Sequence, residues 1–247
     1  MTGELRIIPL AGVPEVEGGD DLAGLLGEAA ERTGGLEDGD VVVVAQKVVS
    51  KEEGRVVRLA ELEASEPARA LAGDQDARHV EAILREAVRL VRVRNGLLIA
   101  ETRHGFVCAS AGVDASNAPG EGQLVLLPLD PDASARRLRG RLGELTGRTV
   151  GVIVSDSFGR PWRQGTTDVA IGVAGTPALL DLRGERDRVG YRLRSTIIAV
   201  ADEIAGAAEL VLGKAGGAPA AIVRGLRLAG DGSGHELVMP AERDLFR

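Results

Sequence analysis

The sequence GVIVSDSFGRPWRQGTTD, residues 151–168, decides the fold because it carries a buried strand into a cluster of polar side chains. Its apolar run stops at Asp156 and Ser157, and a Gly/Pro-containing loop follows with Arg160, Trp162 and Arg163. In open α/β sheets, ligands commonly bind at the carboxyl ends of the strands. Mg²⁺ takes carboxylates and substrate phosphates as ligands, and guanidinium groups hold anionic oxygens. The stretch therefore predicts phosphate chemistry on a metal ion.

The composition is that of an ordinary globular protein with an aliphatic core. Of 247 residues, 44% are hydrophobic and only 2% aromatic, which leaves few rings on which nucleic-acid bases could stack. The net charge of −7 also argues against a nucleic-acid partner. Charged residues interrupt the longest apolar stretch, 196–212, so no membrane partner is expected. The single cysteine and the lack of a signal peptide predict a cytoplasmic protein.

Strands and helices mix along the whole chain, which predicts a mixed α/β (α+β) class. Continuous β-branched runs and alternation predict strands at 5–10, 41–45, 97–101, 106–110, 124–127, 149–155 and 220–224. Helical spacing and capping residues predict helices at 20–32, 76–92, 131–148 and 195–214, with Asp132 at the start of the third. No linker or repeat divides the chain, so we expect one domain over 1–247.

Familiar nucleotide and metal motifs are missing from the sequence. There is no GxxxxGK[ST] loop and no GxGxxG after a strand. The three histidines lie far apart in the sequence and no cysteine pair exists. Any nucleotide site must therefore be built by another route.

Each polar cluster has a simpler interpretation beside the functional one. Asp114 and Asn117 could bind a metal and a nucleotide, or they could form a turn in which Asp and Asn bond their own backbone. Asp156 and Ser157 could ligate a metal, or they could cap the end of a strand. Lys51 could neutralise a phosphate, although such a lysine is more often exposed. The five arginines within 183–194 could recruit anions or form a solvated face.

Six segments, in this order, resemble the coenzyme F420-0:L-glutamate ligases, a family of GTP-dependent γ-glutamyl ligases. They are VVVVAQKVVSKEEGR, AGVDASN, LLPLDPDASA, VGVIVSDSFGRPWRQG, VADEIAGAAELVLGKA and AAIVRGL, and they span nearly the whole chain. The chain also resembles the N-terminal ligase domain of the two-domain actinobacterial enzyme, without its nitroreductase-like C-terminal domain. The resemblance implies the family's own fold, with two intertwined subdomains and a homodimer.

The resemblance also implies a set of site residues. Asp114, Asp156 and Ser157 match the ligands of two divalent ions, Mg²⁺ or Mn²⁺, with K⁺ as a further ion. The nucleotide contacts that it implies are Val13, Pro14, Glu15, Val16, Gln46, Lys51, Asn117, Gly213, Lys214, Ala215 and Gly216. Three positions depart from the usual residues: Gln46 replaces Ser, Ser157 replaces Thr, and Lys214 replaces Glu or Gln.

The implied reaction joins the amine of L-glutamate to a carboxylate of coenzyme F420-0. GTP would first convert the carboxylate into an acyl phosphate, which the amine then attacks. Asp114 and Asp156 would act through the metals, while Arg160 and Arg163 would hold anionic groups of the substrates. Two other functions are kept open at this point: a related ligase with another carboxylate acceptor, and a nucleotide-binding regulatory module without turnover.

Overall fold

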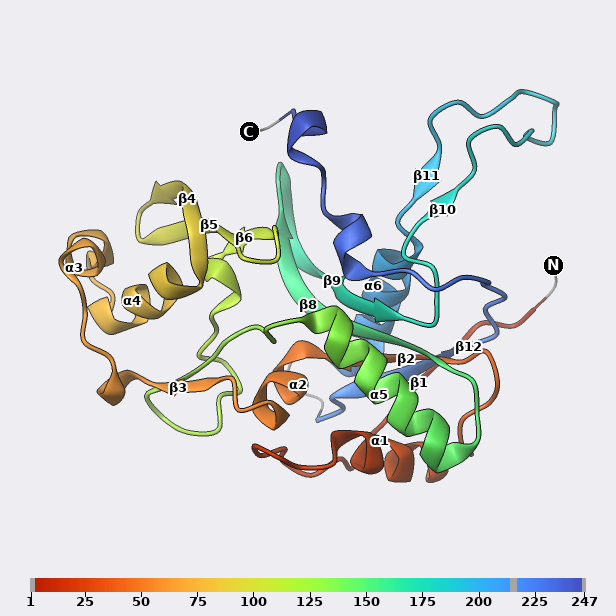
Figure 1. Cartoon of the computed structure of the whole chain (residues 1–247), viewed down its shortest axis with the longest axis horizontal. Coiled ribbons are helices and arrows are strands. Elements are labelled where there is room, and N and C mark those ends of the chain that lie inside the picture. The colour runs from red at the N-terminus through yellow and green to blue at the C-terminus, as the bar shows by residue number, and fades with distance from the viewer. Residues whose placement is uncertain (1–2, 214–216, 246–247) are drawn as a thin grey trace.

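A five-stranded sheet forms the centre of the computed structural model, which describes residues 3–213 and 217–245 (Figure 1). Strands β2 (Val41–Ala45) and β8 (Gly151–Arg160) run parallel to each other, and the other neighbours are antiparallel. The spatial order is β1 (Arg6–Pro9), β12 (Ala220–Arg224), β2, β8 and β9 (Arg163–Ala174). Helices and strands mix along the chain, so the predicted mixed α/β class is confirmed.

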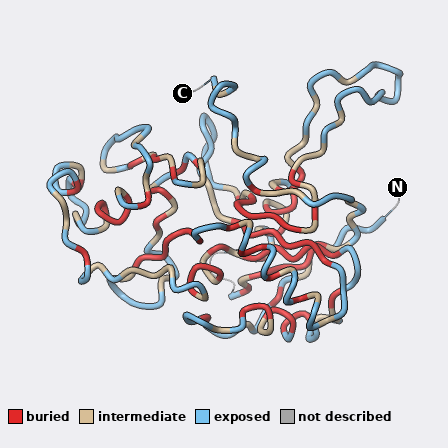
Figure 2. The backbone as a smooth tube through the Cα atoms, in the orientation of Figure 1, coloured by how far each residue is buried: buried red, intermediate tan, exposed pale blue. Residues whose placement is uncertain are grey.

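Helices cover both faces of this sheet. Helices α1 (Leu22–Glu31) and α5 (Pro131–Thr146) pack with Val42 and Val44 of β2 on one face. On the opposite face, α6 (Val200–Leu212) packs with the alternate valines of β2. A strand buried on both faces needs a continuous apolar run, which explains why four consecutive valines occur here. Figure 2 shows this burial as a band of red through the sheet.

The part of the chain that follows α2 (Gln46–Glu52) and precedes α5 forms a smaller lobe. This lobe has its own hydrophobic cluster, whose residues run from Leu62 to Leu126. It lies beside the central sheet at the left of Figure 1. Strands β4, β5 and β6 form one small sheet, and β3 pairs with β7 in another. The elements of the lobe are β3 (Val56–Arg58), α3 (Glu66–Ala72), α4 (Ala77–Glu86), β4 (Ala87–Arg94), β5 (Leu97–Thr102), β6 (Val107–Ala109) and β7 (Gln123–Val125).

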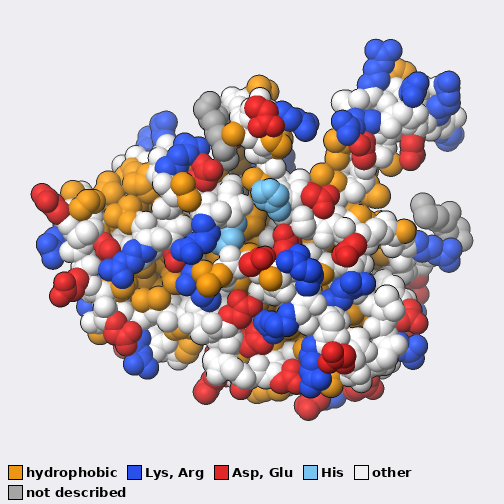
Figure 3. All heavy atoms as spheres, in the orientation of Figure 1, with side chains coloured by type: hydrophobic (Ala, Val, Ile, Leu, Met, Phe, Trp, Pro, Cys, Tyr) orange, Lys and Arg blue, Asp and Glu red, His pale blue; other side chains and the backbone are white. Residues whose placement is uncertain are grey.

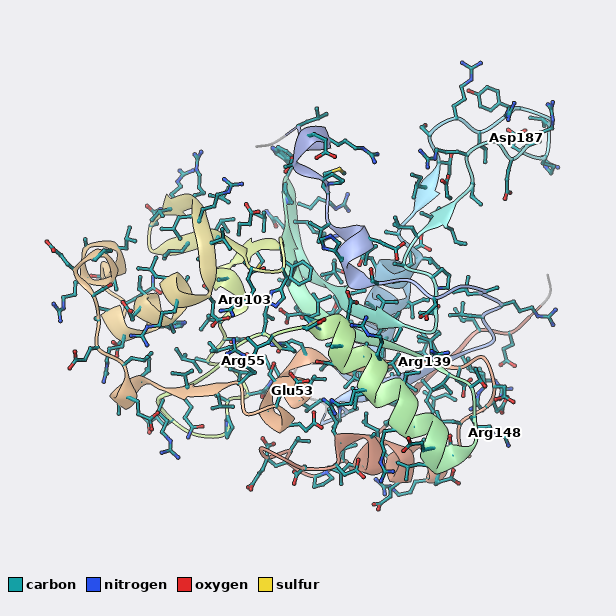
Figure 4. The ribbon with its side chains drawn as sticks, viewed as in Figure 1. Glu53, Arg55, Arg103, Arg139, Arg148 and Asp187 are labelled. Carbon is teal, nitrogen blue, oxygen red and sulfur yellow. The ribbon has the colours of Figure 1, made fainter. Side chains whose placement is uncertain are left out.

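A buried carboxylate ties the smaller lobe to the body. Glu86, at the end of α4, accepts hydrogen bonds from Arg55 at 2.8 Å and from Arg103 at 3.3 Å. The Nε of Arg55 also donates to the carbonyl of Leu127 at 2.9 Å. Figure 4 labels both arginines near the junction between the smaller lobe and α5. Because Glu86 is buried, the loss of either partner would leave polar groups poorly paired there.

The helix predicted over 76–92 is wrong beyond Glu86. Ala87 already has extended backbone angles, and residues 87–94 form β4, which pairs with β5. The apolar residues of this segment fit a helical spacing, but Val88, Val91 and Val93 are β-branched and prefer a strand. Hydrogen-bonded pairing with β5 therefore stabilises residues 87–94 as a strand and not as a helix.

The predicted loop after Asp156 is also wrong, because residues 151–174 form one long hairpin. Strand β8 continues to Arg160, and a two-residue turn at Pro161 and Trp162 leads directly into β9. Trp162 takes a positive φ of 56°, which closes this turn. Asp156 and Ser157 therefore lie within the hairpin, at the point where β8 passes beyond the end of β2.

Of two predicted helix starts, one is confirmed and one is wrong. Helix α5 begins at Pro131 as predicted, with Asp132 in its first turn, and its N-cap is Asp130, whose side chain accepts the N–H of Ala133. Asp132 instead accepts backbone N–H groups from two other segments. Helix α6 begins at Val200 and not near 195, because β11 (Ile197–Ile198) pairs with β10 (Leu180–Asp181) just before it.

The segment 182–196 between β10 and β11 projects from the body (Figure 1). Its five arginines are exposed, and Figure 3 shows blue side chains gathered along it. Asp187, labelled in Figure 4, braces the turn by accepting the N–H groups of Val189 and Tyr191. Among the described residues, no helix is long and apolar enough to cross a membrane.

Candidate active site

A cleft of about 780 Å³ opens where β2 ends and β8 passes beyond it. These two strands are parallel and in register up to the pair Ala45 and Ser155. At the next position Gln46 begins helix α2, while Asp156 stays in β8 and pairs with β9, and both line the cleft. A β-bulge at Ser155 marks this edge, as bulges often do beside functional sites. The topology thus gives the carboxyl-end location that the sequence predicted for a ligand.

Segments far apart in the sequence meet in this cleft. Those of the predicted site residues that line it are Val13, Pro14, Glu15, Val16, Gln46, Lys51, Asp114, Asn117, Asp156, Ser157 and Gly213. Lys214, Ala215 and Gly216 lie outside the described residues. Arg160 and Arg163 do not line the cleft: both are exposed at the tip of the β8–β9 hairpin, where Arg160 donates to the carbonyl of Gln164 at 3.2 Å.

Asp156 is the most perturbed carboxyl group of the cleft. Its pKa is raised to about 7, mainly by burial and in part by the negative charges of Asp168 and Asp114, while the N–H of Ser157 and the charge of Lys47 act to lower it. Part of its surface still faces the cleft. Within the described part of the chain, Asp156 forms no salt bridge, and a bound metal ion would supply a compensating positive charge.

Asp114 is held by a lysine and by its own loop. The Nζ of Lys47 lies 2.7 Å from its carboxylate, and Ser116 donates to it through its backbone N–H at 2.7 Å and its hydroxyl at 2.9 Å. The turn that the simpler interpretation predicted is therefore present, and it keeps Asp114 on the cleft wall. Burial acts to raise the pKa of Asp114, but the bonds from Lys47 and Ser116 outweigh it and lower the pKa.

Helix α2 presents three polar side chains to the cleft, Gln46, Lys47 and Lys51. The buried amide oxygen of Gln46 accepts the hydroxyl proton of Ser50 at 2.7 Å. Its amide nitrogen is buried and has no hydrogen-bond partner among the described residues. Lys51, also buried, forms an ion pair with the exposed Glu15. The free amide of Gln46 and the ammonium of Lys51 could both donate to an anionic ligand.

Three further cleft residues escaped the sequence prediction: Lys47, Asp168 and Glu209. Buried Asp168 accepts the hydroxyl protons of Ser157 at 2.6 Å and Ser155 at 3.0 Å. Its backbone N–H donates to Glu209 of α6 at 3.0 Å. A regular hairpin across Pro161 and Trp162 would pair Ser157 with Thr166, but an irregularity between Gly159 and Arg160 shifts the register and pairs Ser157 with Asp168. Recognising the turn alone would therefore not have revealed Asp168.

The oxygen ligands of the cleft fit a divalent ion that also binds ligand phosphates. Within residues 3–213 and 217–245, no three His, Cys, Asp or Glu side chains gather closely enough to hold a metal by themselves. Mg²⁺ commonly takes only one or two carboxylates and completes its shell with water and phosphate oxygens. Asp114, Asp156 and Ser157 supply such oxygens on one wall, and the raised pKa of Asp156 marks a position where a cation is favoured.

Comparison with known proteins gives one consistent result. The sequence profile of the family described as F420-0:Gamma-glutamyl ligase matches residues 12–225. A coenzyme F420:L-glutamate ligase from Methanopyrus kandleri is 50% identical over 251 residues, covering 98% of each chain. Proteins of the same name from Methanothermobacter thermautotrophicus and Archaeoglobus fulgidus are 45% and 44% identical, covering 98% of this chain and 99% and 96% of their own. The similarity extends over nearly the full length of the chain.

Proposed function

This chain belongs to the F420-0:gamma-glutamyl ligase family, and from that premise we propose that it joins L-glutamate to coenzyme F420-0 through an amide bond, with GTP as the phosphate donor. The observation that carries the proposal is the cleft at the carboxyl end of β2, where β8 passes beyond it. It gathers, from segments far apart in the sequence, eleven residues that the family resemblance implies for nucleotide and metal binding.

The reaction needs GTP because a carboxylate is a poor acyl donor. The γ-phosphate of GTP passes to a carboxylate oxygen of F420-0, which gives an acyl phosphate and GDP. The amine of glutamate then attacks the carbonyl carbon, the bond to the phosphate oxygen breaks, and the amide and inorganic phosphate are released. The first product is F420-1, and repeated cycles would extend the γ-glutamyl tail.

The nucleotide would lie along the wall formed by residues 13–16, Gln46, Lys51 and Asn117, next to the segment that begins at Gly213. Gln46 contributes a buried amide nitrogen that has no partner among the described residues. Lys47 forms an ion pair with Asp114, and its ammonium could turn to a phosphate oxygen when a ligand is bound. Both groups suit transferring phosphates, since charge-assisted donors bind their oxygens strongly.

Asp114, Asp156 and Ser157 would hold two divalent ions, Mg²⁺ or Mn²⁺, and K⁺ would be a further ion. When bound, divalent ions would offset the negative charge that develops on the phosphate oxygens. The role of the chain is to present Asp156 without its proton and to keep Asp114 fixed by its turn. The perturbed pKa of Asp156 supports this role, because such groups concentrate at functional sites.

For features outside the cleft, the proposal rests on the family resemblance. Arg160 and Arg163, at the hairpin tip, would contact anionic groups of F420-0 or glutamate that extend out of the cleft. A homodimer of intertwined chains would enclose exposed segments such as 182–196. The buried single cysteine, Cys108, is compatible with the cytoplasm that the sequence predicted.

The proposal is tested by incubating the protein with GTP, Mn²⁺, L-glutamate and F420-0 and measuring the coenzyme by mass spectrometry. We expect a gain of one glutamyl residue, with GDP and phosphate formed only when both glutamate and F420-0 are present. Unchanged coenzyme would contradict the proposal. Binding of GTP without turnover would favour the regulatory module, and turnover with a different carboxylate would favour a related ligase.

A further inference from the structure

We propose that Asp168 is a positioning residue that orients the hydroxyl of Ser157 toward a bound cation. This inference rests on the proposed function, in which Ser157 is a metal ligand. Asp168 lies on β9 directly opposite Ser157 of β8, in the same part of the hairpin that lines the cleft.

The contacts of Asp168 fix the proton of the Ser157 hydroxyl. One carboxylate oxygen accepts that proton at 2.6 Å, and the other accepts the hydroxyl proton of Ser155 at 3.0 Å. A serine hydroxyl has one proton and two lone pairs. With its proton held by Asp168, Ser157 can offer lone pairs to a cation, whereas an unheld hydroxyl could turn its proton toward that cation.

The pairing of β8 with β9 does not by itself require a carboxylate at position 168. Asp168 is only 7% exposed, and its charge opposes the ionisation of Asp156 nearby. A third carboxylate, Glu209, accepts the backbone N–H of Asp168. Gathering these acids at one place is unfavourable in the absence of a cation. The arrangement becomes favourable once a divalent ion is bound, since outer partners of metal ligands orient them and increase their basicity.

The inference is tested by titrating the purified protein with Mn²⁺ alone and measuring free Mn²⁺ by electron paramagnetic resonance. Asp168→Ala removes the acceptor and should weaken Mn²⁺ binding by about 10- to 100-fold, the usual effect of losing such a partner. Asp168→Asn keeps one acceptor oxygen and should stay within about threefold of the wild type. If Asp168→Ala does not fold, Asp168→Leu fills a similar volume and gives the same test.

A double-mutant cycle shows whether Asp168 acts through Ser157. Ser157→Ala should weaken Mn²⁺ binding, and adding Asp168→Ala to it should cause no further loss. The control is Asp202→Ala, which removes another carboxylate that accepts a β9 backbone N–H, from Ala170, but does not line the cleft. It should leave Mn²⁺ affinity unchanged.

Three results would overturn the inference while leaving the proposed function intact. They are an unchanged affinity in Asp168→Ala, an equal loss in Asp168→Asn and Asp168→Ala, and additive losses in the double variant. An equal loss in the Asn and Ala variants would mean that the charge of Asp168 itself acts on the ion. If the wild type binds no Mn²⁺, both this inference and the proposed metal site are wrong.

Discussion

Replacing Asp156 by Asn should make the metal-free protein more stable at pH 8 while it abolishes turnover. In the folded protein, burial and neighbouring carboxylates raise the pKa of Asp156 from 3.8 to about 7. An acid with a raised pKa binds its proton more tightly in the folded state, so stability is lost as pH rises from the unfolded pKa toward the folded one. Asn cannot ionise, and its side-chain oxygen can still accept the N–H of Ser157.

The magnitude follows from the difference between the two pKa values. A shift of about three units corresponds to about 4 kcal/mol at pH 8, at about 1.4 kcal/mol per unit. Because part of Asp156 faces the cleft, water reduces this effect, and we expect a gain of about 1 to 3 kcal/mol. For a chain of this size, that gain raises the melting temperature by roughly 2 to 12 °C.

The assay is thermal unfolding in chelator, measured at about pH 8 and about pH 5. The gain should fall to less than half at about pH 5, because the wild-type carboxyl group then keeps most of its proton. Asp74→Asn is the matched control, since it changes the net charge equally at an exposed position. Mn²⁺ should stabilise the wild type more than Asp156→Asn. A lower melting temperature for Asp156→Asn at pH 8, or an equal gain at both pH values, would refute the reasoning.

Four other substitutions or treatments test separate features. Gly172→Ala would place a methyl group 2.2 Å from the carbonyl oxygen of Pro131 and should lower the free energy of unfolding in urea by about 1 to 3 kcal/mol or more. Glu86→Gln weakens the tie between the lobes and should destabilise the smaller lobe by about 1 to 3 kcal/mol, seen as faster hydrogen exchange in α3 and α4. Burial raises the pKa of the Cys108 thiol to about 12, so alkylation at pH 8 should be slow in the native protein and fast in urea. Gln46→Ala should raise the KM for GTP about tenfold in steady-state kinetics and leave the far-ultraviolet circular dichroism spectrum unchanged.

Four of the five strands of the central sheet could be predicted because their apolar runs are unambiguous in sequence, whereas β9 was not predicted. Residues 41–45 and 220–224 are short continuous apolar runs, and a buried strand needs little else. Residues 87–94 could not be assigned in the same way, because their valines and arginines satisfy both a helical and an extended spacing. Only the register with β5 decides between the two, and that information is not local.

In the candidate site too, residues marked by the local sequence could be predicted, and a residue placed by strand register could not. Asp156 and Gln46 could be brought together because each follows a continuous apolar run, and the two runs are parallel and in register. Asp168 was missed because the residues that follow Asp156 and Ser157 were interpreted as a loop. Pro161 and Trp162 are not residues typical of a tight hairpin turn, for which Asn and Gly give the strongest signal. The partner of Ser157 therefore remained hidden in the sequence.

The charges of the cleft explain why nucleotide and cation should bind together. Its described lining has five acidic residues and two lysines, Glu15, Asp114, Asp156, Asp168 and Glu209 against Lys47 and Lys51. Both lysines are already paired with carboxylates, so a triphosphate arriving alone would meet mainly negative charge. A divalent cation removes that repulsion and also favours the ionised form of Asp156. Because these carboxylates repel one another and repel a free triphosphate, the cleft would bind a metal-bound phosphate in preference to a free one.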